Sequence, residues 1–370
     1  MPRLSSRVSA AKLGVWPTRV DRLGELARAI GREPDVVYVK RDDLTSPVYG
    51  GNKVRTLEVL FGLAKGRGAT RIYSTGAFGS NHSVAAALHA RRVGLEPCCL
   101  LFPQPHSVAA LENLRVSAEK CARFVAVPHW SALPFGIAWV HFAERRRGER
   151  PFIMVPGGAT PEGAVGYVTA GFELARQVAR AELPKPDRVV IGVGSTCTSA
   201  GLLVGFTLAA RLGIGFIDAR GRPAPPDLVS VRVTPWPVTS ALRIVGLAVR
   251  TSRLLSAITG DPTLALDGRE LQSRLSVDGR FLGRGYGHPT EAGLRAIRTF
   301  RDAGGPELDT TYSAKSAACF IDILSRRVPG VTLYWATKST APLPEIGVSE
   351  KWPRSVRAWI GRAERQLKSR

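Results

Sequence analysis

Cysteine is scarce in this chain, which has only five among 370 residues and no CxxC pair. They are Cys98, Cys99, Cys121, Cys197 and Cys319. This spacing gives neither an even disulfide framework nor a zinc-binding pattern. His82 and His89 lie seven residues apart with no carboxylate at ligand spacing, so we expect no metal site. A reducing, cytoplasmic setting fits this composition best.

Long hydrophobic runs and acidic residues are also few. No apolar run approaches the roughly 18 residues that span a bilayer, so we expect no membrane association. Only 30 Asp and Glu accompany 52 Lys and Arg, and the net charge is +22. Such a field attracts nucleic acid non-specifically, but no aromatic residues interleave with the arginine runs as in a stacking platform. We therefore expect a solvated basic surface and no specific nucleic-acid partner, and rank nucleic-acid binding last.

The first 20 residues contain no acid, which is typical of a transit peptide. Trp16-Pro17-Thr18, however, already resembles folded-domain sequence. We therefore expect an ordinary N-terminus.

The chain does contain alternating β-rich and helical patterns over most of its length. The predicted strands are 36–40, 71–74, 97–102, 123–127, 152–155, 188–193, 228–234 and 331–336. The predicted helices include 83–93, 133–147, 164–180, 200–212, 317–326 and a basic amphipathic helix within 352–370. We expect the apolar face of this last helix, Val356, Trp359 and Ile360, to pack into the core. Repeated β-α units predict an α/β fold with parallel sheets covered by helices on both faces. Ligands of such sheets bind at the carboxyl ends of the strands.

One lysine follows a tight turn, Gly50-Gly51-Asn52-Lys53. Glycine lets the backbone adopt positive φ and approach a ligand closely. A lysine just after such a turn can project into a cleft, where desolvation favours the neutral amine that attacks a carbonyl group. The alternative is a solvated lysine at the start of a helix.

A second turn, Thr75–His82, runs from a strand into a helix. Ser80 and Asn81 would place a hydroxyl and an amide where helix N–H groups converge, which favours anionic ligands. Simple N-capping of the helix by either residue is an equally good interpretation.

The strand ending at Val193 leads into small and hydroxylated residues, Gly194-Ser195-Thr196-Cys197-Thr198-Ser199, and then into a helix. Such a loop offers a nest of backbone N–H groups for a phosphate monoester. It lacks the Gly-Lys-Ser/Thr ending of a Walker loop and the third glycine of a dinucleotide fingerprint. Phosphate binding is favoured over an ordinary capped turn.

A fourth segment, Leu308–Ser316, precedes a helix near the C-terminus. Tyr312 could stack on a ring or move a proton, and Ser313 could bond a ring nitrogen. A capping serine and a core tyrosine would give the same pattern.

Together these segments resemble a known family. Residues 39–44 followed by 50–55 closely resemble a signature of fold-type II pyridoxal-phosphate enzymes, and within them of the 1-aminocyclopropane-1-carboxylate deaminase/D-cysteine desulfhydrase family. Segments 80–82, 157–163, 194–201, 286–291 and 312–315 occur in the family's order. The resemblance covers roughly residues 17 to 340.

This resemblance implies two parallel-sheet, three-layer α/β domains of the tryptophan synthase β-like class, with pyridoxal 5'-phosphate in the cleft between them. The large cofactor-binding domain would comprise residues 1–55 and 166–370, and the small domain residues 56–165. Enzymes of this class are commonly homodimers, so we expect a homodimer.

The resemblance also assigns roles to residues. Lys53 would be the Schiff-base lysine, and Asn81 would bond the ring hydroxyl of the cofactor. Gly194, Ser195, Thr196, Cys197 and Thr198 would line the phosphate. Ser80 would bind the substrate carboxylate or relay a proton, and Tyr312 would lie against the ring and substrate. Ser313 would face the pyridine nitrogen. The remaining substrate-binding residues would be Asn81, His82 and Tyr286.

Three segments depart from the family's pattern. Thr196 and Cys197 replace two inner glycines of the loop Gly-Ser-Gly-Gly-Thr, and each adds a Cβ that narrows the nest. Lys338 occupies a glycine position in the family's late His-Thr-Gly-Gly segment. Ser313 stands where the ring-opening deaminases carry Glu. A neutral hydroxyl there predicts a weaker electron sink, which suits loss of a good leaving group such as thiolate.

We therefore expect a pyridoxal-phosphate-dependent carbon–sulfur lyase or deaminase. Its reaction would be β-elimination on a small amino acid, as in D-cysteine desulfhydrase, giving a 2-oxo acid and ammonia. One alternative is 1-aminocyclopropane-1-carboxylate deaminase-type ring opening. Another is a non-catalytic binding protein that keeps the fold.

Overall fold

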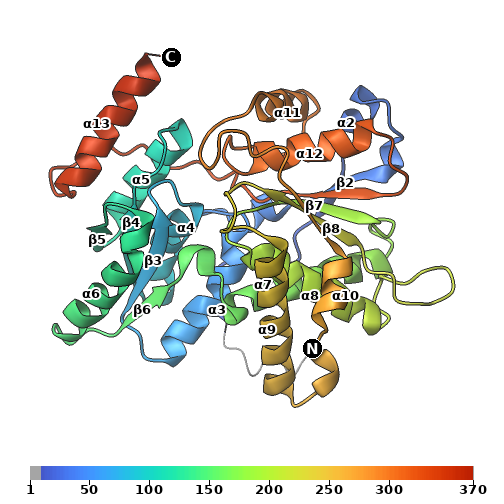
Figure 1. Ribbon diagram of the computed structural model, residues 1–370, viewed down its shortest axis with the longest axis horizontal. Helices are drawn as coiled ribbons and strands as arrows, with labels where there is room; N and C mark the ends of the chain where they lie inside the picture. Colours follow the sequence, from blue (N-terminus) through green and yellow to red (C-terminus); the bar gives the residue numbers. More distant parts are fainter. Residues whose placement is uncertain (1–9, 370) are drawn as a thin grey trace.

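The computed structural model describes residues 10–369 and contains two sheets, each flanked by helices (Figure 1). The first nine residues of the acid-free N-terminal segment lie outside the described part. The six-stranded sheet takes its strands from residues 20–40 and 188–335, and the four-stranded sheet takes its strands from residues 71–154. The predicted α/β fold with two parallel-sheet units is confirmed.

The six-stranded sheet has the order β1-β2-β10-β7-β8-β9. Its strands are β1 Val20–Arg22, β2 Val37–Lys40, β7 Arg188–Val193, β8 Asp227–Arg232, β9 Leu275–Asp278 and β10 Thr332–Trp335. All neighbours are parallel except β1, which pairs antiparallel with β2. Leu333 of β10 lies opposite Tyr38 on one side and Val189 on the other. The last strand of the chain is therefore central in the sheet.

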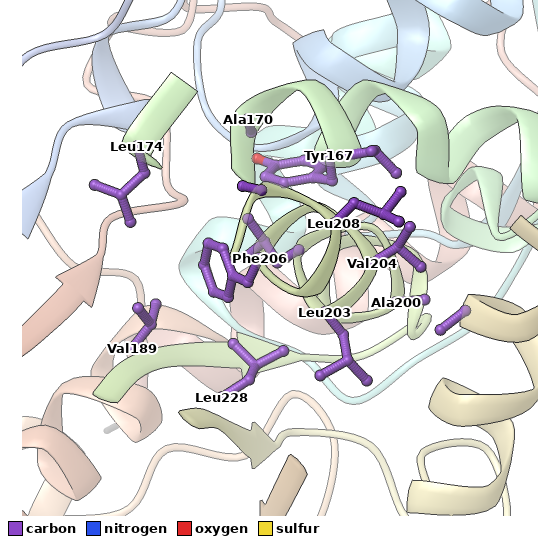
Figure 2. Close-up of a cluster of buried hydrophobic side chains, with 14 of the residues drawn as sticks. Tyr167, Ala170, Leu174, Val189, Ala200, Leu203, Val204, Phe206, Leu208 and Leu228 are labelled. Atoms are coloured by element: carbon purple, nitrogen blue, oxygen red, sulfur yellow. The ribbon is translucent and has the colours of Figure 1, made fainter. Parts of the chain in front are cut away.

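Helices cover both faces of this sheet, as buried parallel strands require. One face is packed by α2 Gly24–Ala29, α11 Glu291–Asp302 and α12 Ser313–Ser325. The other is packed by α7 Pro161–Ala179, α8 Cys197–Arg211, α9 Ala241–Thr259 and α10 Gly268–Ser273. Figure 2 shows α8 inside this second layer, with Leu203 and Phe206 among the side chains of Val189 and Leu228. Tyr167 of α7 lies on another side of α8 in the same cluster.

The four-stranded sheet has the order β5-β4-β3-β6, and all its pairs are parallel. Its strands are β3 Arg71–Ala77, β4 Glu96–Phe102, β5 Arg123–Ala126 and β6 Pro151–Met154. On one face lie α3 Lys53–Gly66, α4 Asn81–His89 and α5 Val108–Lys120, and on the other lies α6 Leu133–Arg145. Short 3-10 turns occur at 34–36, 42–44, 90–93, 130–132, 156–158 and 262–264.

The C-terminal helix α13, Arg354–Lys368, packs beside α5 on the four-stranded sheet (Figure 1). Val356, Trp359 and Ile360 are buried there, which confirms that this face packs into the core. We propose the division into residues 1–55 plus 166–370 and residues 56–165, with α13 as an exception. Helix α13 lies within 166–370 in the sequence, but its apolar face packs in one cluster with Phe78 and Leu114 of the smaller unit.

Most predicted elements are present, with shifted ends. Helices α7, α8 and α12 begin three or four residues before the predicted positions 164, 200 and 317. Their first turns are polar or small, so hydrophobic periodicity could not detect them. Strands β1 and β9, and helices α2, α5, α9, α10 and α11, were not predicted. Among residues 10–369 no helix is long and apolar enough to cross a membrane.

A buried network of charged residues connects β2, α3 and α7. Arg55 of α3 donates to Asp42 Oδ1 at 2.8 Å and to Glu173 Oε1 of α7 at 2.9 Å. Lys40, at the end of β2, donates to the same Glu173 oxygen at 2.6 Å. Asp42 also accepts hydrogen bonds from Thr18, Tyr167 and Trp335. Burial, the largest single influence, would raise the pKa of Asp42, but Arg55, Lys40 and Trp335 together lower it. The carboxylate is therefore ionised and fully satisfied.

Replacing Asp42 by Ala should leave Arg55 and Lys40 buried with too little negative charge. We expect Asp42→Ala to lower the free energy of unfolding by about 3–5 kcal/mol, measured by urea denaturation. Asp35→Ala is the matched control, because Asp35 pairs with Arg22 on the surface, where removal costs about 0.5 kcal/mol or less. Similar losses in both variants would contradict this account.

Candidate functional site

Four turns of the candidate site lie at carboxyl ends of strands. The lysine turn follows β2, the Ser80-Asn81 turn follows β3, and the loop 194–196 follows β7. Gly157-Gly158 follows β6. Because the strands of each sheet are parallel, these ends meet at one edge of the sheet. A cleft of about 840 Å³ opens beside the Ser80-Asn81 turn, between residues of the two sheet units, among them Tyr49, Asn81, Asn113, Asp309 and Tyr312.

The lysine turn packs against a segment far along the chain. Gly51 has φ +85°, and a Cβ at this residue would lie 2.5 Å from the Thr337 carbonyl oxygen. Asn52 N–H donates to that oxygen at 3.1 Å, and Gly50 N–H donates to Ser339 Oγ at 2.8 Å. Glycine is therefore required both by backbone conformation and by close approach. This packing fixes where α3, and with it Lys53, begins.

Lys53 is partly buried at the start of α3. Burial lowers the pKa of its amine, and the nearby Cys197 thiol opposes that shift. A Cβ on Gly157 would lie 3.9 Å from Lys53 Nζ and would collide with Ser195, so the lysine tip, the glycine turn and the loop after β7 are neighbours. The interpretation as a fully solvated surface lysine is wrong.

The loop after β7 turns into α8 through an unusual residue. Thr196 has φ +72°, a left-handed conformation that β-branched residues rarely adopt. The glycine conformation is thus kept although the glycine is absent. Asn52 donates from Nδ2 to Thr198 Oγ1 at 3.0 Å, and the Cys197 thiol donates to the Gly158 carbonyl oxygen at 3.2 Å. The first N–H groups of α8 lack partners within the helix, which suits an anion.

In the turn after β3, Ser80 and Asn81 have different roles. Ser80 Oγ accepts from Ser83 N–H at 3.3 Å, so this serine caps α4, as the capping interpretation predicted. Asn81 Oδ1 accepts from Asn113 Nδ2 at 2.7 Å and from Tyr49 OH at 3.2 Å. These bonds fix the orientation of the amide and leave Asn81 Nδ2 as the group available to a ligand.

His82 is buried, and within residues 10–369 neither ring nitrogen has a hydrogen-bond partner. Burial, and then the charge of Lys53, lower its pKa to about 3. The ring is therefore neutral, and its Cε1 would lie 3.3 Å from a Cβ on Gly158. Buried polar atoms without partners are rare and call for an explanation.

Two tyrosines meet on the other side of the site. Tyr312 and Tyr286 share a hydrogen bond of 2.5 Å between their hydroxyl groups. Burial raises the pKa of Tyr286 to about 12 and raises that of Tyr312 well above its usual value. Both phenols are therefore protonated at neutral pH. A Cβ on Gly194 would lie 3.2 Å from the Tyr312 ring, so this ring lies directly against the loop after β7.

Lys315 holds the segment that presents Tyr286. Its ammonium donates to the carbonyl oxygens of Leu282 and Gly285 at 2.8 Å each. Burial lowers the pKa of Lys315 to about 8, and Asp309 opposes the shift.

Ser313 is fully buried at the start of α12. Its hydroxyl donates to Asp309 Oδ2 at 2.9 Å. Lys338 lines the cleft. Its ammonium does not block the lysine turn, because it donates to Glu307 at 3.3 Å and to the Ser339 carbonyl oxygen at 2.9 Å.

Sequence reasoning gave no role to several residues that position others. These are Tyr49, Asn113, Gly157, Asp309, Lys315 and Ser339. Asp309 carried a local signal, because an Asp four residues before a helix-starting serine is typical of a capping turn. The contacts of Tyr49 and Asn113 with Asn81 span 32 residues each and left no local pattern.

The residues present fit an anionic carbonyl cofactor. The N-terminus of α8 and the left-handed Thr196 form an anion nest, and Gly157 leaves room only for hydrogen beside Ser195. An amine of lowered pKa and an unsatisfied imidazole lie next to that nest. The phosphate, the carbonyl carbon and the ring of such a cofactor thus each have a candidate partner among these residues.

Relief of the strain at Thr196 should be measurable. We expect Thr196→Gly to be more stable than Thr196→Ala by about 1 kcal/mol, because only glycine adopts positive φ freely. At Thr198, inside α8, the order should reverse by a similar amount. Thermal and urea unfolding of the four variants tests both differences. The same order at both positions would contradict the left-handed conformation.

Known proteins of similar sequence point to the same cofactor. The family model described as "Pyridoxal-phosphate dependent enzyme" matches residues 11–327. Nocardicin C-9' epimerase of Nocardia uniformis subsp. tsuyamanensis is 34% identical over 342 residues, covering 89% of this chain and 92% of the relative. D-cysteine desulfhydrase of Salmonella choleraesuis (strain SC-B67) is 30% identical over 317 residues, covering 84% and 87%.

A solved structure described as an ACC deaminase homologue superposes with a TM-score of 0.73 at 25% identity and covers 92% of this chain and 96% of its own. The predicted fold-type II architecture is confirmed by this likeness. The predicted dependence on pyridoxal phosphate is confirmed by the family match over most of the chain. The chain therefore belongs to the family of pyridoxal-phosphate dependent enzymes.

Proposed function

We propose that this enzyme removes a β-substituent, thiolate foremost, from a small amino acid and releases a 2-oxo acid and ammonia. The observation that carries the proposal is the position of Lys53, an amine of lowered pKa beside the nest at the start of α8. The likeness to D-cysteine desulfhydrase over 84% of the chain supports the same reaction class.

Each holding role follows from a contact already described. The N–H groups of Thr196, Cys197 and Thr198 would bind the phosphate, together with the side chain of Ser195. Asn81 would donate from Nδ2 to the ring hydroxyl, because its Oδ1 is occupied by Asn113 and Tyr49. Lys53 would attach the cofactor's aldehyde carbon covalently. Gly194, which has no side chain, would leave space for the cofactor ring beside Tyr312.

Bound pyridoxal phosphate supplies an electron sink for the charge that develops at Cα. Lys53 then accepts the Cα proton, which its lowered pKa favours. The Cβ–S bond breaks and sulfur leaves with the electron pair. The enamine that is released takes up one water molecule and gives the 2-oxo acid and ammonia. The Tyr312 hydroxyl, oriented by Tyr286, donates a hydrogen bond to the departing sulfur and keeps its proton, because its pKa is raised by burial. His82 stays neutral and offers a hydrogen bond to the substrate carboxylate. Ser80 can offer another, because its oxygen accepts from Ser83 N–H and its hydroxyl proton stays available.

Epimerisation of an amino-acid centre is a second candidate. It is favoured by the 34% identity with an enzyme named nocardicin C-9' epimerase. Loss of the Cα proton is common to both reactions, but here a proton returns to the opposite face and no bond to sulfur breaks. In D₂O, deuterium incorporation into recovered amino acid without 2-oxo acid would identify this reaction.

The substrate is tested by adding D-cysteine, L-cysteine or 1-aminocyclopropane-1-carboxylate to the pyridoxal-phosphate-loaded enzyme. We expect pyruvate and sulfide from a cysteine enantiomer, since Ser313 replaces the glutamate of ring-opening deaminases. Formation of 2-oxobutyrate would instead identify ring opening. No product and no deuterium exchange with any of them would overturn the proposed reaction.

Lys53→Ala should reduce product formation at least about a hundredfold, because a general base is lost. Lys65→Ala is the control, as Lys65 is exposed on the same helix. Steady-state rates of both variants give the comparison. Full activity in Lys53→Ala would exclude this lysine from the chemistry.

The cytoplasmic setting stays a proposal as well. All five cysteines are free thiols, which is typical of proteins kept in reducing surroundings. Fractionation of cells that make the protein tests it.

We also propose that the enzyme is a homodimer. Phe135, Trp139 and Phe142 lie on the outer side of α6 and are 79%, 53% and 59% exposed. An exposed row of three large apolar residues is uncommon on a monomer.

Trp139→Glu should therefore halve the molar mass measured by light scattering, because a charge would be buried in the interface. Leu242→Glu, on the exposed side of α9, should leave the mass unchanged. A monomeric parent protein, or equal effects of both substitutions, would refute the proposal.

A further inference from the structure

Ser313, the first residue of α12, exchanges hydrogen bonds with Asp309. Ser313 Oγ donates to Asp309 Oδ2 at 2.9 Å, while Asp309 N–H donates back to Ser313 Oγ at 2.6 Å. Ser313 N–H also points at Asp309 Oδ2, at 3.3 Å. Both side chains are buried, so water does not compete freely for these bonds.

The other carboxylate oxygen of Asp309, Oδ1, accepts two further hydrogen bonds that hold the side chain in place. Thr311 N–H and Tyr312 N–H donate to Oδ1 at 2.8 and 2.6 Å. Four donors thus converge on one carboxyl group, and such a group acts only as an acceptor. The side chain can neither rotate away nor offer a proton without losing several of these bonds.

The hydrogen-bonding capacity of Ser313 Oγ is nearly filled. A serine hydroxyl has one proton and two acceptor lone pairs. Asp309 Oδ2 takes the proton, and the Asp309 N–H group takes one lone pair. One lone pair remains. Ser313 can therefore accept one more hydrogen bond but cannot donate one.

We propose that Asp309 is a positioning residue that makes the Ser313 hydroxyl an obligate acceptor, so that the cofactor's ring nitrogen is bound there in its protonated form. The inference rests on the proposed function and on the role that the family resemblance gives to Ser313, which is to face that nitrogen. A protonated ring nitrogen withdraws electrons more strongly than a neutral one. Ser313 backed by Asp309 thus corrects the weaker electron sink expected from a neutral hydroxyl alone.

The phenols that surround Asp309 carry no charge at pH 7. Four tyrosines lie within its electrostatic reach, and burial raises the pKa of each: Tyr49, Tyr286, Tyr312 and Tyr334. They therefore stay uncharged. Lys315 is the cation that interacts with Asp309, and its ammonium is bonded to two carbonyl oxygens of the Tyr286 segment.

Asp309→Asn tests the proposal with little change in shape. Asn Oδ1 would keep the N–H groups of Thr311 and Tyr312, which places Nδ2 next to Ser313. Nδ2 would then donate to Ser313 Oγ, and the hydroxyl proton would turn toward the ring nitrogen. Asp267→Asn is the control, because Asp267 is exposed at the N-terminus of α10, which it caps, and asparagine caps equally well.

The measurement uses the full chain loaded with pyridoxal phosphate carrying ¹⁵N at the ring nitrogen. We expect its ¹⁵N chemical shift to report a protonated nitrogen through neutral pH in the parent protein and in Asp267→Asn. In Asp309→Asn the nitrogen should be neutral there, its pKa lower by about one to three units. Should Asp309→Asn fail to fold, Ser313→Ala gives the second test, because removal of the acceptor should also lower that pKa.

The outcomes distinguish failure of the proposed function from failure of the role of Asp309. A protein that binds no pyridoxal phosphate overturns the proposed function and the role of Asp309 with it. A loaded parent protein with a neutral ring nitrogen overturns only the role of Asp309. That role is also overturned if Asp309→Asn, or Ser313→Ala in its place, keeps the nitrogen protonated as in the parent protein.

Discussion

The buried ion network around Asp42 and Arg55 is the constraint on which the site depends. It joins the end of β2 to α3 and α7 through side chains that are almost fully withdrawn from water. Buried charges add little net stability when they are paired, but they are costly when they are misplaced. The network therefore permits one arrangement of β2, α3 and α7. Lys53 lies two residues before Arg55, so its position follows from that arrangement.

Two glycines that pack closely against distant segments also fix the position of the site. Gly51 fits against Thr337, and Gly157 fits against Ser195, with no space for a Cβ at either glycine. These contacts connect the lysine turn, the glycine turn after β6 and the loop after β7. Thr196 departs from this use of glycine, since it adopts the left-handed conformation while carrying a branched side chain. The surrounding packing outweighs its local preference.

Much of the fold could be predicted because buried parallel strands and amphipathic helices leave strong local patterns. Strand β7 was predicted with its observed ends, and so was the buried face of α13. Strands β1 and β9 are short and lie at the sheet edges, where burial leaves a weaker pattern. The candidate site was predicted from turns whose residue types carry the chemistry. The residues that orient it were not, because Tyr49 and Asn113 reach Asn81 only after folding. The role of Ser313 was predicted without Asp309, because residue types alone do not reveal the hydrogen bond between the two side chains.

The bond between Gly50 N–H and Ser339 Oγ has a consequence for the synthesis of the protein. It joins residues 289 positions apart, and the strand before Ser339, β10, separates β2 from β7 in the sheet. The ribosome produces the lysine turn early, but the segment that shapes it emerges only after most of the chain. Because such distant contacts form late, the nascent chain cannot capture its cofactor domain by domain. Loading of the enzyme must therefore follow release of nearly the whole polypeptide, when free cofactor meets a completed sheet.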